Sequence, residues 1–268
     1  MGKEQKIRRS GFLPSRDLQF WGMLFVALGI AGRAIVENVL LEGRGDGTLE
    51  SLAAIVESSP LSAHSVSMAI IFRSIQTVAT PIFAFLLVEG IWNTSDSKKY
   101  FLRLLGLAVL CEIPYNLAMG GSWLVLSSRN PVFGLVFGLV MLMFMMQYQG
   151  GGVRNAALKA AVILAALVWV MLLRVDHGAE LIVMAAVFWL FYDKPKGRAL
   201  AGAIAMFACV VFSVYNVLGA AGCLLVLAYN EEWGYPNRYF RYLSYPVLLA
   251  VFAVISWVLP MVLSLFIQ

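Results

Sequence analysis

Apolar runs that reach or approach the roughly 20 residues needed to cross a hydrocarbon core recur along the whole sequence. Of the 268 residues, 61% are hydrophobic and 13% are charged, and the mean hydropathy is +0.82. A soluble domain carries about 25% charged residues, so this chain has too few to cover a water-facing surface. The sequence therefore predicts an all-α fold, a polytopic transmembrane helical bundle in contact with membrane lipids.

Lysine and arginine are unevenly distributed among the predicted loops, which indicates how the chain crosses the membrane. They gather in residues 1–17 and in the loops after the second, fourth, sixth and eighth apolar runs. Because cytoplasmic loops carry an excess of Lys and Arg, the amino terminus is expected in the cytoplasm. We predict about nine spans, with seven or eight left open, over residues 18–41, 65–92, 100–119, 132–148, 156–173, 179–192, 199–214, 217–229 and 245–266.

The chain is expected to form one membrane domain. Residues 1–17 are predicted as a basic cytoplasmic segment and residues 18–268 as a single integral membrane domain. Residues 42–64 are predicted as an extracytoplasmic loop with a short helix over 48–58. The formal charge of +5 is attributed to membrane topology, and no nucleic-acid partner is expected. Three cysteines, all in apolar segments, predict neither a disulfide framework nor a metal site.

The stretch CEIPYNLA, residues 111–118, places the carboxylate of Glu112 beside a proline inside an apolar run. A charge there is costly and marks either a function or a buried partner. At about 1.5 Å per residue, Arg73 lies roughly 13 Å from the outer end of its span and Glu112 roughly 18 Å from the inner end of its own. In a core about 30 Å thick the two lie at one level, so we predict an Arg73–Glu112 pair. Such a pair lines a functional site or fixes the register of two helices.

Other polar residues gather at the predicted outer ends of the spans. His177 is the candidate general base, oriented by Asp176 or Glu180, unless it is a satisfied residue at a loop corner. Asn116 shares a helix face with Glu112, because the two are four residues apart. The remaining polar residues expected in this outer half are Arg33, Glu37, Arg129 and Asn130.

Basic residues also lie in two predicted cytoplasmic turns. They determine topology, and they would also suit the phosphates of a donor molecule. Glu89, near the cytoplasmic end of the second predicted span, is expected to be a solvated charge at a helix end. The basic residues of the two turns are Lys98, Lys99, Lys194, Lys196 and Arg198.

Five segments carry a resemblance: FAFLLVEG, KYFLRLLGLA leading into CEIPYNLA, RNPVFGLVFGLVML, HGAELIVMAAVFW and NRYFRYLSYPVLL. Together they resemble the TraX family of polytopic membrane proteins, over most of the chain from Thr80 onward. The resemblance implies a bacterial cytoplasmic-membrane enzyme that uses cytoplasmic acetyl-coenzyme A. The conjugation-associated members are linked to acetylation of the pilin amino terminus at the extracytoplasmic face. The family motif falls here on Glu89, Glu112, Pro114, Asn116, Asn130, Pro131, Tyr245 and Pro246.

The sequence departs from the family pattern in its histidines. An Asp-His pair in the first span and a His soon after the last-span Tyr-Pro are both missing, and only His64 and His177 are present. Acyl transfer is therefore expected to depend on His177 as base, with Arg73 or Arg129 stabilising the oxyanion. The expected catalytic set is His177, Glu112 and Arg73. The expected set for an extracytoplasmic peptide, pilin or glycan acceptor is Asn116, Arg129, Asn130, Glu180, Arg33 and Glu37.

Two other functions remain open at the level of the sequence. One is a transporter of small solutes or lipids, with Arg73 and Glu112 along its path. The other is a noncatalytic membrane factor for surface assembly, in which Glu112 has a purely structural role.

Overall fold

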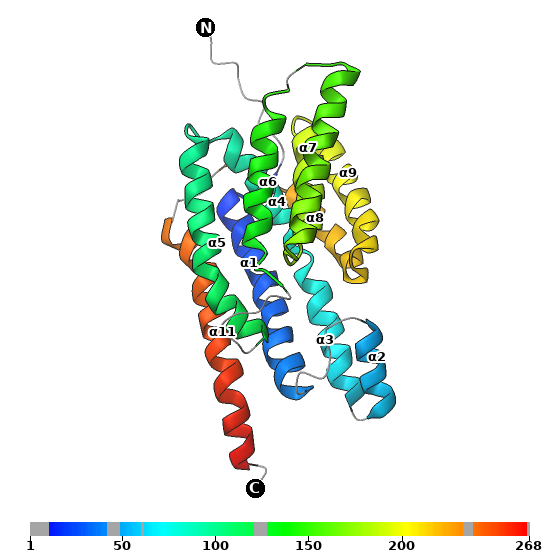
Figure 1. Ribbon diagram of the computed structural model, residues 1–268, viewed down its shortest axis with the longest axis vertical. Coiled ribbons are helices and arrows are strands. Elements are labelled where there is room, and N and C mark those ends of the chain that lie inside the picture. The colour runs from blue at the N-terminus through cyan, green and yellow to red at the C-terminus, as the bar shows by residue number, and fades with distance from the viewer. Residues whose placement is uncertain are drawn as a thin grey trace.

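The computed structural model describes residues 11–41, 49–59, 62–120, 128–148, 150–232 and 238–266. Over these residues the chain is helical apart from turns and two isolated bridges, which confirms the predicted all-α class (Figure 1). The helices are α1 Ser15–Ala31, π-helix η1 Gly32–Leu40, α2 Leu49–Ser58, α3 Ala63–Gln76, α4 Ala79–Trp92, α5 Ser97–Gly120, α6 Val132–Met145, α7 Val153–Leu172, α8 Gly178–Leu190, α9 Pro195–Ala208, the 3-10 helices η3 Cys209–Val211 and η4 Val214–Ala221, α10 Gly222–Leu227 and α11 Arg238–Phe266.

Within the described residues, five helical stretches are long and apolar enough to cross a membrane. They are Ser15–Leu40, Ala63–Trp92, Ser97–Met119, Val153–Leu172 and Tyr242–Val262. Three shorter apolar stretches accompany them, Val132–Met145, Gly178–Leu190 and Val214–Leu227. These lengths and compositions define a multi-pass helical membrane protein, while the count of nine spans and the orientation stay predictions.

Part of the predicted organisation falls on residues outside the description. These are residues 1–10 of the basic segment and residues 42–48 and 60–61 of the predicted extracytoplasmic loop. The described remainder of that loop contains α2, Leu49–Ser58, which confirms the short helix expected there.

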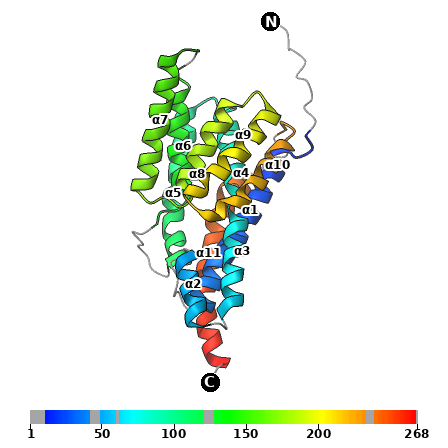
Figure 2. The same cartoon turned by 90° about the vertical axis from the view of Figure 1, so that its right-hand side faces the viewer.

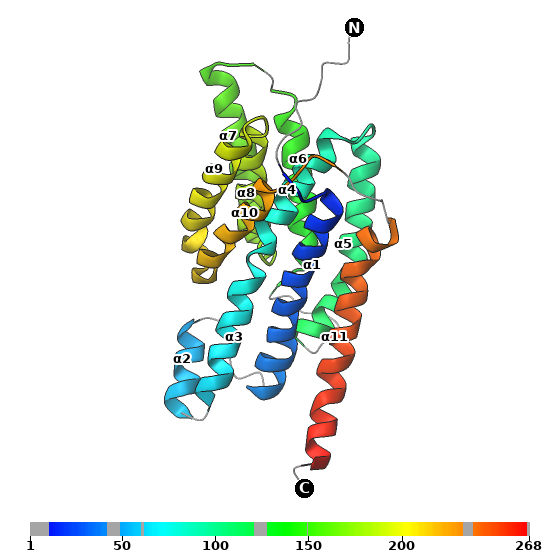
Figure 3. The same ribbon diagram turned by 180° about the vertical axis from the view of Figure 1, so that it is seen from behind.

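Helix α4 is the centre of the bundle. Most of its residues are buried, and it packs against α1, α6, α8 and α10. Helices α6 to α10 lie around one half of the long axis, whereas α2, α3 and the end of α11 extend to the other (Figures 1 and 2). From behind, α1 lies between the α3–α4 pair and the α5–α11 pair (Figure 3). The turns 93–96 and 191–194 meet at one end, where the Tyr192 hydroxyl donates to Glu89 at 2.7 Å; we call this the Asn93 end.

The second predicted span is two helices, α3 and α4, which meet at Thr77 and Val78. Pro81 accounts for the break, because it lacks an amide hydrogen and its ring crowds the carbonyl four residues earlier, that of Thr77. The Thr77 hydroxyl donates to the carbonyls of Ser74 (2.7 Å) and Tyr215 (3.1 Å). Pro81 thus explains the kink between α3 and α4, and polar groups cover it.

The first predicted span ends in the π-helix η1, which nothing in the hydropathy pattern indicates. π-Helical turns are rare and occur frequently at functional sites. Gly32, the first residue of η1, lies so close to Phe72 of α3 that a Cβ would overlap that side chain. This close approach turns the following residues toward the interior, where Glu37 is only 5% exposed.

We predict that Gly222→Ala destabilises the protein, because the new Cβ would overlap the carbonyl oxygen of Val78 at the helix break. Backbone cannot move aside as a flexible side chain can, so the expected cost is about 1–3 kcal/mol. Thermal melting in detergent micelles would show a fall of several degrees. Gly106→Ala is the matched control, since no atom lies within 4 Å of its Cβ position. An unchanged melting temperature for Gly222→Ala would contradict the packing of α10 on α4.

Candidate functional site

The corner between α7 and α8 is held against the segment that precedes α6. The Arg129 amide donates to the Arg174 carbonyl, and the Asp176 amide donates to the Arg129 carbonyl, both at 2.9 Å. These bonds form a parallel bridge between Arg129 and Val175. His177 follows at the N-cap position of α8 in a left-handed conformation, with φ of 52°. Few non-glycine residues adopt this conformation, so the surrounding contacts must hold the His177 backbone in place.

Glu112 of α5 fixes the segment before α6. Its Oε1 accepts a 2.8 Å hydrogen bond from Arg129 Nη1, and its Oε2 accepts a 2.6 Å bond from Asn130 Nδ2. The same Asn130 nitrogen donates to the Ala108 carbonyl at 2.9 Å, and Asn130 Oδ1 accepts from the Val132 amide at 3.1 Å. Glu112 therefore acts at a distance from His177, by holding the segment to which the α7–α8 corner is bonded.

Asp176 stands beside His177 and is anchored by two other residues. Its Oδ2 accepts a 2.8 Å hydrogen bond from the Tyr115 hydroxyl and lies 3.6 Å from Arg33 Nη1. Its Oδ1 lies 4.0 Å from His177 Nε2. Burial raises the pKa of Asp176, but the charges of His177 and Arg33 and the Tyr115 hydrogen bond outweigh burial and lower it. An ionised Asp176 can orient the imidazole and stabilise its protonated form.

The predicted pair between Arg73 and Glu112 is wrong, because Arg73 binds Glu37 instead. Nε and Nη2 of Arg73 donate to the two oxygens of Glu37 at 2.5 and 2.6 Å, a bidentate arrangement. The guanidinium also lies 5.7 Å from the centroid of the Tyr215 ring. Residue counting gives the depth of a side chain along its helix but not the direction in which it points. Glu37, in the π-helix η1, is thus the partner of Arg73, a role that was expected of Glu112.

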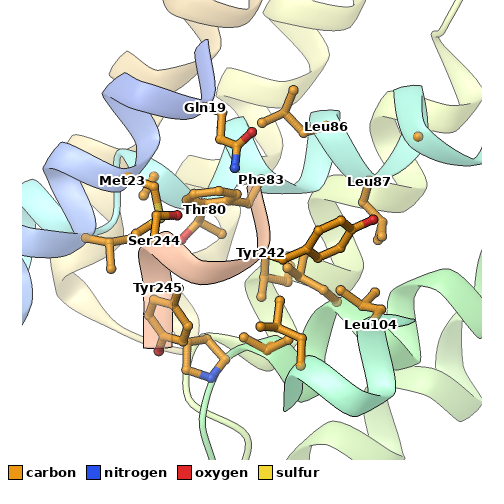
Figure 4. Close-up of a pocket in the computed structure, with 18 of the residues that line it drawn as sticks. Gln19, Met23, Thr80, Phe83, Leu86, Leu87, Leu104, Tyr242, Ser244 and Tyr245 are labelled. Atoms are coloured by element: carbon orange, nitrogen blue, oxygen red, sulfur yellow. The ribbon is translucent and has the colours of Figure 1, made fainter. Parts of the chain in front are cut away.

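A long cavity of about 340 Å³ runs along one face of α4 (Figure 4). Within α4 its lining extends from Ala79 to Gly90, 11 residues, or roughly 17 Å at about 1.5 Å per residue. Arg103 and Tyr100 lie at the Asn93 end, and His177 lies at the other. The lining residues are Ser15, Gln19, Met23, Val26, Gln76, Ala79, Thr80, Phe83, Leu86, Leu87, Gly90, Asn93, Thr94, Tyr100, Arg103, Leu104, Leu107, Pro131, Val132, Leu135, His177, Leu181, Tyr242, Ser244 and Tyr245.

A second cavity of about 560 Å³, the polar cavity, lies on the other side of His177. Five of its lining residues carry or can carry charge at neutral pH besides His177. His177 and Gln76 line both cavities, so they form the boundary between them. The lining residues are Arg33, Arg73, Gln76, Ser128, Val170, Met171, Arg174, Val175, Asp176, His177, Ala179, Glu180, Phe212, Ser213, Val214 and Tyr215.

The structure separates the predicted outer residues into two groups. The first group lines the polar cavity and comprises Arg33, Arg73, His177 and Glu180. The second lines neither cavity and comprises Glu37, Glu112, Asn116, Arg129 and Asn130. The hydrogen bonds of the second group hold the walls of the site, whereas the first group faces the space that a ligand would occupy.

The basic residues predicted to bind a donor lie at the Asn93 end. The exposed ones are Lys98, Lys99, Lys194 and Lys196. The Lys99 ammonium is 3.2 Å from Asp96, whose pKa is lowered by the hydrogen bonds that it accepts from Lys99. Arg198 differs, because it is 4% exposed and lies 4.4 Å from the centroid of the Phe85 ring. Its burial removes Arg198 from the surface that a donor would meet.

Glu89 is not a solvated charge at a helix end, as the sequence indicated, but a buried residue, 6% exposed. Its oxygens accept hydrogen bonds from Tyr192 (2.7 Å), Tyr229 (3.0 Å) and Asn93 (3.0 Å). Two of these donors, Tyr192 and Tyr229, lie outside the helices and far along the chain, which no local pattern around Glu89 reveals. The expectation failed because chain position near a turn does not determine burial.

Sequence reasoning did not assign a role to several residues of the two cavities. Gln76 and Thr80 follow Arg73 at helical spacing, and this polar stripe in an apolar run was the available signal. Arg103 lies one turn beyond Lys99 and was not singled out from the basic turn. Asn216, which binds Glu180 at 2.8 Å, lies in a short irregular stretch without a sequence signature.

The fold and the site define a multi-pass helical membrane protein in which a histidine separates an elongated cavity from a charged one. A family model, described as TraX protein, matches residues 61–256. The chain belongs to the TraX family, and the resemblance seen in the sequence is confirmed. No curated protein and no solved structure matches the chain.

The corrected pairing predicts how substitutions combine in their effect on the free energy of unfolding. Glu37→Gln and Arg73→Gln should be non-additive, with a coupling energy of about 1–3 kcal/mol, because their side chains share a bidentate contact. Glu112→Gln and Arg73→Gln should add within about 0.5 kcal/mol, because these side chains share no contact. Denaturant titration in detergent micelles measures both cycles. A larger coupling for the Glu112 cycle than for the Glu37 cycle would restore the pair predicted from the sequence.

Proposed function

We propose that this TraX-family protein is a membrane acyltransferase in which the donor occupies the long cavity and the acceptor the polar cavity. The observation that carries the proposal is that His177 lines both cavities. A general base must lie within hydrogen-bond reach of the proton that it removes, and a nucleophile must lie near the acyl carbon. A single imidazole at the boundary of two cavities satisfies both conditions.

The donor side fits an elongated molecule. The long cavity extends roughly 17 Å along α4 and has a volume of about 340 Å³. Polar side chains recur in its lining: Thr80, Ser244 and Gln19 are labelled in Figure 4, and Arg103 belongs to the same lining. This succession suits the amides and phosphate of a phosphopantetheine arm, which supports acetyl-coenzyme A as donor. Lys98 and Lys99 would meet the remaining phosphates.

The chemistry assigned to the chain's own residues is proton transfer and charge stabilisation. Neutral His177 removes a proton from the attacking amine or hydroxyl as a bond forms to the thioester carbon. The carbon–sulfur bond then breaks, and the departing thiolate takes the proton from His177. Asp176 stabilises the imidazolium between these steps, at 4.0 Å from its Nε2.

Arg33 is better placed than Arg73 to stabilise a developing oxyanion. Both line the polar cavity, but Arg73 uses two nitrogens on Glu37, whereas Arg33 lies 3.6 Å from Asp176 and makes a looser pair. A looser pair leaves donors free to turn toward new negative charge. We therefore transfer the oxyanion role predicted for Arg73 and Arg129 to Arg33.

The proposed location and biological acceptor follow the family. The bacterial cytoplasmic membrane, with the amino terminus in the cytoplasm, would place the Asn93 end on the side of cytoplasmic acetyl-coenzyme A. The polar cavity would then face the outer side, where a peptide, pilin or glycan acceptor is met. Reconstituted vesicles with labelled acetyl-coenzyme A test this directly. Solute flux without any labelled covalent product would show that the protein is a transporter and not an acyltransferase.

We predict that His177→Asn abolishes acyl transfer without unfolding the protein. Asparagine tolerates the left-handed conformation with φ of 52°, so the corner keeps its shape while the base is lost. The expected fall in kcat is about 100- to 10,000-fold, measured as label transferred in proteoliposomes. His64→Asn, at the exposed second histidine of α3, is the control and should retain full activity. Full activity of His177→Asn would remove His177 from the mechanism.

We also predict that Arg103→Gln raises the KM for acetyl-coenzyme A roughly tenfold at nearly constant kcat. The loss of one phosphate contact at the far end of the long cavity weakens binding by about 1.4 kcal/mol without altering the reacting groups. Arg154→Gln, at an exposed arginine of α7 outside the cavity, is the charge-matched control. Equal KM values for the two variants would show that the donor does not enter from the Asn93 end.

A further inference from the structure

Glu180 is a buried carboxylate whose charge is incompletely balanced. It is 5% exposed, lies in the first turn of α8 and lines the polar cavity. Its Oε1 accepts a 2.8 Å hydrogen bond from Asn216 Nδ2, which is the contact that the structure gives it within the described residues. A neutral amide and a helix amino terminus compensate only part of the cost of burying a carboxylate. The remaining cost calls for a positive charge within the cavity.

The chain's own cations in this cavity are committed to other partners or stand at its edge. Arg73 is bound to Glu37, and Arg33 lies beside Asp176. The described residues contain no group of three or more His, Cys, Asp or Glu that could hold a metal ion. A positively charged group on a ligand is the partner that matches Glu180.

Arg174 places a positive charge at the edge of the same cavity. It is exposed, lines the cavity and has a left-handed backbone, with φ of 52°. Its carbonyl is held by the Arg129 amide at 2.9 Å, which fixes the backbone from which the side chain starts. Among the residues that the structure describes, its guanidinium makes no ion pair. The cavity therefore combines a buried carboxylate that lacks a cationic partner with a solvent-exposed guanidinium at its edge.

We propose that the polar cavity binds an amino-acid-like zwitterion, with the ligand ammonium at Glu180 and its anionic group at Arg174. A volume of about 560 Å³ is ample for a dipeptide-sized ligand. Glu180 is three residues after His177, so the two side chains lie on neighbouring positions of the helix and both face this cavity. This inference rests on the proposed function in one respect: the zwitterion is taken to be the acyl acceptor.

The proton balance of the step follows from this arrangement. The ammonium gives one proton to His177 and attacks the thioester carbon as the neutral amine. As the amide bond forms and the carbon–sulfur bond breaks, the nitrogen releases a second proton. One proton reaches the thiolate and the other reaches solvent. The product has no ammonium, so its attraction to Glu180 is lost and it leaves the cavity.

Calorimetric titration of the purified full chain in detergent micelles tests the site without any donor present. The probes are glycylglycine, N-acetylglycylglycine without the ammonium, and glycylglycinamide without the carboxylate. We expect glycylglycine to bind at least tenfold more tightly than either derivative. Absence of glycylglycine binding, or equal binding of the N-acetyl form, would overturn the proposal.

Two variants test which residue binds each of the two charged groups of the ligand. Glu180→Gln retains an oxygen for Asn216, so the fold should persist while the preference for a free amine over the N-acetyl form disappears. Arg174→Asn suits the left-handed backbone and should remove the preference for the carboxylate over the amide. Glu50→Gln, at an exposed carboxylate of α2, should leave all three affinities unchanged. Wild-type discrimination in Glu180→Gln would refute the assignment.

A transfer assay on the same preparations separates this inference from the proposed function. Binding with the expected discrimination but no acyl transfer would disprove the acyltransferase and leave the zwitterion site standing. Transfer to a hydroxyl acceptor, undiminished in Glu180→Gln, would disprove the zwitterion site and leave the acyltransferase standing.

Discussion

A carboxylate buried in an apolar bundle must find donors, and Glu112 finds them in Arg129 and Asn130. This one requirement ties α5 to the segment before α6, and that segment bonds in turn to residues 174–176 of the next corner. The backbone of His177 leaves this corner in a conformation that its own side chain does not favour. The position of the His177 imidazole between the two cavities therefore depends on the charge of Glu112, a residue that lines neither cavity.

Two helical irregularities, the break before α4 and the π-helix η1, lie beside the site. In an apolar environment each unsatisfied backbone group costs several kcal/mol, so breaks occur where protein partners are present. The Thr77 hydroxyl and the nearby η4 segment cover the break before α4. The π-helix η1 brings Glu37 to Arg73, which lies four residues before that break. Irregularity and charge pairing thus occur together on the wall of the polar cavity.

The sequence predicts the helices and the level of the polar residues because hydropathy marks the spans and the rise per residue is constant. It does not predict partners. Glu112 and Arg73 lie at similar depths, yet the first binds Arg129 and the second Glu37, because direction around a helix axis depends on tertiary packing. The burial of Glu89 and Arg198 escapes prediction for the same reason, since their partners come from distant parts of the chain.

The contrast between the two cavities bears on how a transfer reaction would proceed in one direction. The long cavity attracts through apolar contact along its length, whereas the polar cavity attracts through separated charges. In the proposed reaction an ammonium enters because Glu180 lacks a cation, and acylation destroys that ammonium. Glu180 therefore favours binding of the acceptor before transfer and no longer favours binding of the product afterwards. Loss of the ammonium weakens the binding of the product, because the chemistry itself removes the interaction that held the acceptor.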